Sequence, residues 1–198
     1  MHITLTIKEV VKIIEAAHGT TRAMLILMYL HGLRPREVVK LQIDHVDFKR
    51  LVFCIKQKNK SKRTFPIIPI IEELLRQAIG NRESGLVFTS TNGGPVSDFR
   101  TRLNMAKGGA CITRAVSLHD LRHACATHLF EHCKDLRSIQ DFLGFAGVYS
   151  TLNNTKGTLD NIRDAISALW DEYFKVSLAF GFAKPGNSDN GKKPDNRY

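Results

Sequence analysis

The segment SLHDLRHACATHLFEHC, residues 117–133, combines a helix cap, two basic side chains and a helical apolar spacing. Ser117 and Asp120 stand three residues apart, as the two partners of a capping box do, so a helix is predicted over this segment. His119 and Arg122 share one face of its first turns, where backbone N–H groups and the helix dipole favour an anion. An arginine fork fits two phosphate oxygens, and a histidine exchanges protons near neutral pH. The spacing indicates an anion site, although H-x-x-R alone is more often an ordinary surface pair.

Apolar residues also recur at helical spacing in the chain before this segment. Three helices are predicted there: Thr6–Ala17, Thr20–His31 and Pro35–Leu41. The second is apolar on nearly all sides and is therefore expected to be buried. Gly32 is a natural stop for it, and Pro35 suits the first turn of the third, where a backbone donor has no partner. Arg34 then stands at the cap of the third helix, beside N–H groups that point outward.

After residue 41 the apolar period changes from helical to alternating. Three strands are predicted: Val46–Phe48, Leu51–Ile55 and Arg63–Ile67. The turn between the second and third strands, residues 56–62, is polar and strongly basic. Between residues 34 and 63 there are ten Lys or Arg against three acidic residues, so the basic excess is concentrated here. A solvated loop explains this turn equally well when the turn is taken alone.

The rest of the chain is predicted to be mainly helical. Further helices are expected at Pro69–Ile79, Ser97–Lys107, Asp135–Leu143 and Leu159–Phe174, with a short extended piece at Leu86–Thr89. The fold class is therefore α+β and mainly α, with a small three-stranded antiparallel sheet. Residues 1–180 are expected to form one domain, since 198 residues are too few to give two domains a sizeable core each. Residues 181–198 are rich in Pro, Gly, Asn, Asp and Lys, which predicts a disordered tail.

The composition limits the classes of partner. Lys and Arg number 29 against 19 Asp and Glu, a net charge of +10, which favours a polyanion, although solubility alone is a competing interpretation. The apolar run Ala23–Leu30 is far below a membrane span, and no signal segment opens the chain, so no membrane partner is expected. The four cysteines form no C-x-x-C pair, which favours a reducing, cytoplasmic compartment. Histidines crowd residues 119–132, but H-E-x-x-H is absent, so no metal and no cofactor are expected.

Four motifs occur in a fixed order along the chain. They are GLRPREVVKL at residues 32–41, Lys58 on a basic turn with RTFP at 63–66 just after it, LHDLRHACATHL at 118–129, and DLRSIQDFLG at 135–144. Their order, spacing and local structure resemble the catalytic domain of the tyrosine recombinases, the phage-integrase family of site-specific DNA recombinases. The resemblance spans roughly residues 4 to 175.

The resemblance implies a role for each matching residue. Arg34 and Arg122 would bracket the scissile phosphate and stabilise charge on its non-bridging oxygens. Lys58 matches the general acid to the departing 5′-hydroxyl, and His119 matches the histidine that hydrogen-bonds the phosphate. Glu37 matches an acidic position that supports the active-site helix. The neighbouring cations are expected to bind DNA: Arg36, Lys60, Lys62 and Arg63. These roles agree with the general need of phosphoryl transfer for positioned positive charge.

Two positions depart from the family pattern. Phe145 stands where the family has a hydrogen-bond donor, and Asn154 stands where the family places its nucleophilic tyrosine. An amide cannot form a phosphotyrosyl link, so cleavage is expected to be impaired. Tyr149 is a possible alternative nucleophile after a register shift, although Ser150 and Thr151 argue against one.

The other tyrosines suggest no nucleophile. Tyr29 and Tyr173 are expected to pack in the core, and no role is evident for Tyr198. Three functions therefore stay open: a DNA-binding recombinase relative with impaired cleavage, an active enzyme that uses Tyr149 or a partner's tyrosine, and a regulator that occupies recombination sites. The expected partners are double-stranded DNA and other recombinase subunits, on which the last helix would dock unless it packs on its own core. The family's N-terminal DNA-clamping domain is expected to be absent, whether in a short form or a fragment, and DNA binding to be weak.

Overall fold

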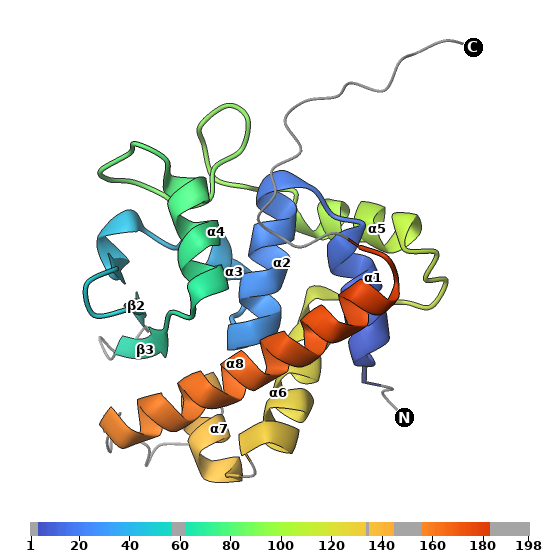
Figure 1. The fold of residues 1–198 in the computed structure, drawn as a ribbon. Coiled ribbons are helices and arrows are strands. Elements are labelled where there is room, and N and C mark those ends of the chain that lie inside the picture. Colours follow the sequence, from blue (N-terminus) through green and yellow to red (C-terminus); the bar gives the residue numbers. More distant parts are fainter. Residues whose placement is uncertain (1–3, 57–61, 134, 145–155, 183–198) are drawn as a thin grey trace.

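The structure is a computed structural model that describes residues 4–56, 62–133, 135–144 and 156–182 (Figure 1). Its helices are α1 (Ile7–Glu15), α2 (Gly19–His31), α3 (Pro35–Val39), α4 (Pro69–Ile79), α5 (Phe99–Gly109), α6 (Leu118–Cys133), α7 (Leu136–Leu143) and α8 (Lys156–Ala179), with a short 3-10 turn at Ile43–His45. Its strands are β1 (Val46–Asp47), β2 (Val52–Lys56) and β3 (Lys62–Pro66). The predicted fold class, mainly helical with a small antiparallel sheet, is confirmed.

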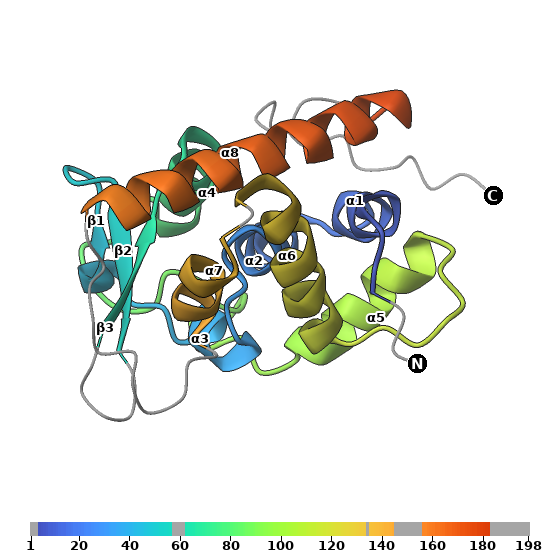
Figure 2. The same cartoon turned by 90° about the horizontal axis from the view of Figure 1, so that it is seen from below.

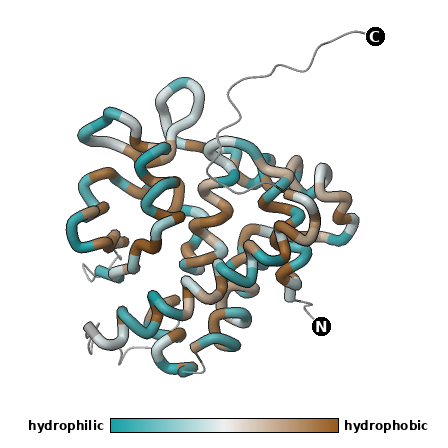
Figure 3. The backbone as a smooth tube through the Cα atoms, viewed as in Figure 1, coloured by the Kyte–Doolittle hydropathy of each residue, from teal (hydrophilic) through white to brown (hydrophobic). Residues whose placement is uncertain are grey.

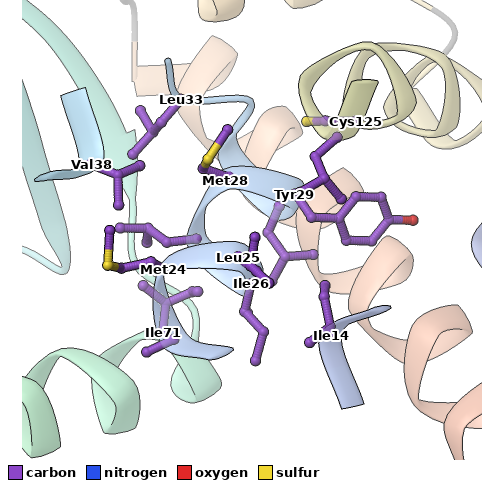
Figure 4. Packing of buried hydrophobic residues seen from close by; sticks show 14 of the residues in the cluster. Ile14, Met24, Leu25, Ile26, Met28, Tyr29, Leu33, Val38, Ile71 and Cys125 are labelled. Atoms are coloured by element: carbon purple, nitrogen blue, oxygen red, sulfur yellow. The ribbon is translucent and has the colours of Figure 1, made fainter. Parts of the chain in front are cut away.

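Helix α2 lies at the centre of the molecule and contacts α1, α3, α4, α5, α6 and α8 (Figure 1). Every residue from Ala23 to His31 is buried, as expected for a helix that is apolar on all sides. Figure 4 shows how its side chains meet those of the surrounding elements, among them Ile71 of α4 and Cys125 of α6. Hydrophobic residues gather along this central helix, while the outer turns are mostly hydrophilic (Figure 3). The packing around α2 therefore positions α3 and α6, which both contact it.

The sheet has the order β1-β2-β3 and is antiparallel throughout. Phe53 of β2 lies opposite Phe65 of β3, and the two rings stack with centroids 5.0 Å apart. The strand predicted to begin at Leu51 begins one residue later, because Leu51 has a left-handed φ of 52° in the turn. The buried face of the sheet packs against α7, where Phe142 lies edge-on to Phe65.

Helix α8 is longer than the predicted Leu159–Phe174 and runs along one side of the molecule, over the sheet, α6 and α1 (Figures 1 and 2). It continues past Phe174 because Tyr173 and Ser177 both donate hydrogen bonds to Glu15 Oε1 of α1, at 2.8 and 3.1 Å. Arg22 of α2 approaches Glu15 Oε2 at 2.6 Å. These four residues are called the Glu15 cluster below, and they tie α8 to its own chain.

Other helix ends differ from the sequence predictions by a few residues. Helix α3 ends at Val39 rather than at residue 41, and α5 begins at Phe99 rather than at residue 97. Asp98 takes the N-cap position of α5, and its carboxylate pairs with Arg102 at 2.8 Å instead of capping a backbone N–H. None of the described helices is long and apolar enough to cross a membrane. The predicted tail comprises residues 181–198, and from residue 183 onward it lies outside the described residues.

Candidate phosphate-binding site

The turn between α2 and α3 places Arg34 at the surface. Gly32 ends α2 with a left-handed φ of 58°, and a Cβ at this position would clash with the side chain of Leu143. The left-handed backbone favours glycine, and any larger residue would also have to displace the Leu143 side chain. Arg34 follows as the N-cap of α3, and its backbone N–H donates to Glu37 Oε2 at 2.7 Å. Its guanidinium donates to Glu37 Oε1 at 3.0 Å, and its side chain is 46% exposed.

The start of α6 places His119 and Arg122 differently from what their spacing suggests. Asp120 is buried and accepts hydrogen bonds from the backbone N–H and the hydroxyl of Ser117, at 2.6 and 2.9 Å. This arrangement fixes the first turn of α6. His119 is exposed, whereas Arg122 points inward and is only 4% exposed. The two side chains are one turn apart, but they lie at different depths.

Arg122 holds together two turns that are far apart in the sequence. Its guanidinium donates to the carbonyl oxygens of Gly32 and Leu143. Burial lowers the pKa of Arg122 to about 10, and the positive charges of Arg34 and Arg63 act in the same direction. The group still carries its charge at neutral pH.

Arg63 was expected to contact DNA, and the structure corrects this expectation. It is 7% exposed, and its guanidinium lies 5.0 Å above the ring of Phe65. One terminal nitrogen donates to Glu37 Oε1 at 2.6 Å, and the other donates to Leu143 O at 2.7 Å and Phe142 O at 3.2 Å. Arg63 faces the interior because it follows the alternation of β3, in phase with Phe65. Its two terminal nitrogens therefore face protein acceptors rather than DNA.

Three guanidinium groups converge on the end of α7, and Arg34, Arg63 and Arg122 are called the arginine cluster below. Arg63 and Arg122 both donate to Leu143 O, and Arg34 approaches Gly144 O at 3.5 Å. Carbonyls at a helix C-terminus carry partial negative charge, which favours this convergence.

Glu37 is the carboxylate that bridges the arginine cluster, since it bonds to both Arg34 and Arg63. Burial acts to raise its pKa, but Arg63, the Arg34 backbone N–H and the Arg34 guanidinium lower the pKa overall. Glu37 is thus ionised at neutral pH. Three positive charges against this one negative charge leave an excess that suits an anion.

The remaining predicted site residues divide into two groups. Arg36 on α3 and Lys62 at the start of β3 are exposed. The others lie outside the described residues: Lys58, Lys60, Phe145, Tyr149 and Asn154. Among the residues that the structure describes, no group of three His, Cys, Asp or Glu side chains could hold a metal ion.

Two tyrosine side chains are buried in the core, as the sequence predicted, and their hydroxyl groups have hydrogen-bond partners there. Tyr29 is 1% exposed, and its hydroxyl lies 2.9 Å from Nδ1 of His128. Tyr173 is fully buried and donates to Glu15. Burial raises the pKa of both phenols well above the usual value. Neither hydroxyl is available to attack a bound phosphate.

One supporting residue was not anticipated from the sequence. His31, the last residue of α2, is fully buried among Phe53, Phe65 and Phe142. Its Nε2 lies 2.8 Å from the carbonyl oxygen of Pro66, so it holds the end of β3 in place. Its position within an apolar helix indicated burial, but the acceptor could not be found from the sequence because it belongs to the main chain of another element.

Comparison with known proteins identifies relatives of this chain. A model of the phage integrase family matches residues 4–155. Tyrosine recombinase XerD of Halalkalibacterium halodurans is 30% identical over 177 residues, which cover 81% of this chain and 59% of XerD. XerD of Pseudomonas aeruginosa is 34% identical over 140 residues, covering 66% of this chain and 47% of that protein. The chain thus spans about half to three fifths of the length of these relatives.

Solved structures share the fold. The integrase from mycobacterium phage Brujita superimposes with a TM-score of 0.68 at 22% identity, covering 85% of this chain and 58% of the integrase. The lambda integrase catalytic core superimposes with a TM-score of 0.60 at 19% identity, covering 72% of this chain and 95% of that core. Family match, relatives and fold agree that this chain belongs to the phage integrase family, the tyrosine recombinases, and has the fold of their catalytic domain.

Proposed function

We propose that this chain binds double-stranded DNA by gripping a backbone phosphate with Arg34, backed by the positive charge of Arg122, and that it acts at recombination or integration sites without cleaving the strand efficiently. The observation that carries the proposal is the arginine cluster. Three guanidinium groups meet at the end of α7, and one carboxylate, Glu37, pairs with Arg34 and Arg63, which leaves a positive excess whose exposed member is Arg34. A phosphodiester supplies the negative charge and the paired oxygens that such a site favours.

The exposure of each side chain indicates its role in holding the phosphate. Arg34 is the half-exposed member, so it would contact a phosphate oxygen directly. Arg122 lies deeper, and it adds positive charge behind that contact while it holds Gly32 and Leu143 together. His119 is exposed on the first turn of the same helix, where it would hydrogen-bond the phosphate. Lys58 belongs to the segment between β2 and β3, and a proton from it would assist departure of a hydroxyl.

The proposed deficiency in cleavage concerns the attacking group. The family's nucleophile position is occupied by Asn154, whose amide cannot displace a phosphate oxygen. The buried hydroxyls of Tyr29 and Tyr173 are bonded to His128 and Glu15, so neither would replace the nucleophile. Binding and chemistry are thus separable in this proposal: the cations for gripping are present, and the nucleophile is substituted.

The proposed partners are DNA and further recombinase subunits. Structures with the same fold include XerH bound to its difH substrate and a lambda integrase tetramer bound to a Holliday junction. We extend DNA binding and assembly of this kind to the present chain as part of the proposal. Residues 1–180 would form the catalytic-type domain that makes these contacts.

A nicked suicide substrate tests the proposed deficiency. Duplexes selected from a random pool for binding to the chain would be nicked beside each phosphate, incubated with the protein and run on a denaturing gel. We expect retention of duplex on a native gel without a covalent adduct on the denaturing gel. Asn154→Tyr is the informative variant, because a restored nucleophile on an intact grip should produce an adduct.

A covalent adduct with the unmodified chain would contradict the proposed deficiency. If that adduct were lost in Tyr149→Phe, Tyr149 would be the nucleophile and the chain an active enzyme. An adduct that survived Tyr149→Phe but required a second, active recombinase would place the nucleophile on a partner. Absence of DNA retention in every condition would contradict the grip itself.

A further inference from the structure

Arg63 occupies a central place in the hydrogen bonds of the arginine cluster. Its side chain leaves β3 toward the interior and reaches α3 through Glu37 and the end of α7 through Leu143 and Phe142. It therefore joins three elements that are separated in the sequence. Two of them carry the site: Arg34 is the N-cap of α3, and α7 ends at Leu143, whose carbonyl oxygen Arg122 also contacts.

Arg63 shares one acceptor with each of the two gripping arginines. Glu37 Oε1 accepts from Arg63 at 2.6 Å and from Arg34 at 3.0 Å. Leu143 O accepts from Arg63 at 2.7 Å and also from Arg122. A continuous path of hydrogen bonds thus runs from Arg34 through Arg63 to Arg122. A shift of the central guanidinium would change the acceptor available to both neighbours.

The surroundings of Arg63 fit an arginine closely. Gly144 has a left-handed φ of 70°, and a Cβ there would lie 3.1 to 3.4 Å from Nη1, Cδ and Cζ of Arg63. The ring of Phe65 lies on another side of the guanidinium. A planar fork can donate to Glu37 and to two carbonyls at once, whereas a lysine ammonium concentrates its donors at one point. Lysine would keep the charge but lose part of this geometry.

From this geometry we infer that Arg63 is a positioning residue, which sets the guanidinium of Arg34 for the phosphate by sharing Glu37 with it and by fixing the end of α7. The inference rests on the proposed phosphate grip. Without Arg63, Glu37 would pair with Arg34 alone and draw its guanidinium inward, away from the DNA. The loss would therefore appear in DNA binding through Arg34, beyond any change in stability.

A double-mutant cycle separates positioning from general structural damage. The full chain, Arg63→Lys, Arg34→Ala and the double variant would be titrated against a labelled mixed-sequence duplex at low salt, with urea unfolding measured for each. We expect Arg63→Lys to weaken binding about fivefold in the parent chain and less than about twofold in the Arg34→Ala background, since residues that act together are not additive. Arg50→Lys, the same change at an exposed arginine of the β1–β2 turn, serves as the control and should leave affinity unchanged.

The outcomes separate the positioning role of Arg63 from the phosphate grip of Arg34. Unchanged binding by Arg63→Lys, or an equal loss in both backgrounds, would overturn the positioning role while the grip stands. Unchanged binding by Arg34→Ala would overturn the grip, and the positioning role with it. Should Arg63→Lys fail to fold, Arg63→Met takes its place in the cycle, because it keeps an unbranched side chain and removes the donors to Glu37 and Leu143. Equal losses with and without Arg34 would again overturn the inference.

Discussion

The Glu15 cluster and the arginine cluster differ in charge balance. The Glu15 cluster joins α1, α2 and α8 through one carboxylate, one guanidinium and two hydroxyl groups. The arginine cluster joins α3, β3, α6 and α7 through three guanidinium groups and one carboxylate. A balanced cluster is complete without a ligand, whereas an excess of buried charge of one sign is costly unless an anion offsets it. Charge balance, more than burial, therefore distinguishes the structural cluster from the site.

The largest effect on stability is expected at the balanced cluster. Glu15→Ala would remove the ion-pair partner of Arg22 and the acceptor of the buried Tyr173 hydroxyl, and loss of one partner from this largely buried cluster costs about 3 kcal/mol in the free energy of unfolding. Urea unfolding of the variant measures this loss. Glu72→Ala is the control, because it removes a carboxylate from a more exposed pair with Arg76 and should cost about 0.5 kcal/mol or less. Equal losses would mean that the Glu15 cluster is not a structural anchor.

Acid is expected to weaken the side of the fold that carries the arginine cluster. Burial lowers the pKa of His31 to about 4, partly opposed by the carbonyls of Pro66 and Leu27, so the folded state keeps the ring neutral. The unfolded chain takes up a proton near pH 6.5. Stability is therefore complete above about pH 6.5 and falls as the pH drops toward 4, by about 2 kcal/mol between pH 7 and 5.

Histidine variants test which residue causes this pH dependence. His31→Gln retains a donor for Pro66 O but cannot titrate, so the fall in the urea midpoint between pH 7 and 5 should become shallower. Part of the fall should persist, because burial also lowers the pKa of His128. His18→Gln changes an exposed histidine and should leave the slope as it is. A slope that His31→Gln leaves unchanged would exclude His31 as its source.

The fold was predictable where local signals mark both ends of an element. Pro69 and Gly80 bound α4, and the structure has this helix at the predicted residues. The extension of α8 was not predictable, because Ser177 is buried by its contact with Glu15, which lies 162 residues earlier in the chain. The same limit applies to helix ends that depend on contacts with distant elements.

The site was predictable in its residue types and only partly in their arrangement. The motifs identified Arg34, Glu37 and Arg122, which the structure brings together. They did not reveal the carbonyl acceptors at the end of α7, because every residue type has a backbone carbonyl. The inward direction of Arg63 was available from its alternation with Phe65, but the surrounding positive charge favoured the interpretation as a DNA contact.

Arg122, the most buried member of the arginine cluster, tests whether the shape of the guanidinium matters for DNA binding in addition to its charge. Arg122→Lys keeps the charge but cannot span the carbonyls of Gly32 and Leu143 as a fork does. We expect DNA affinity to fall about tenfold, or about 1.4 kcal/mol. Fluorescence anisotropy with a labelled duplex measures the change, and urea unfolding shows how much stability is lost with it. Affinity equal to that of the parent chain would show that charge alone suffices at this position.

The central claim is that the positive excess of the arginine cluster binds a DNA phosphate through its exposed member. The most direct measurement is the salt dependence of duplex binding by Arg34→Ala, compared with Arg76→Ala, which removes an exposed arginine that is paired with Glu72. We predict that Arg34→Ala weakens binding about fivefold and lowers the slope of log affinity against log salt by about one, while Arg76→Ala changes neither. Equal effects of the two variants, or an unchanged slope in Arg34→Ala, would contradict the phosphate grip.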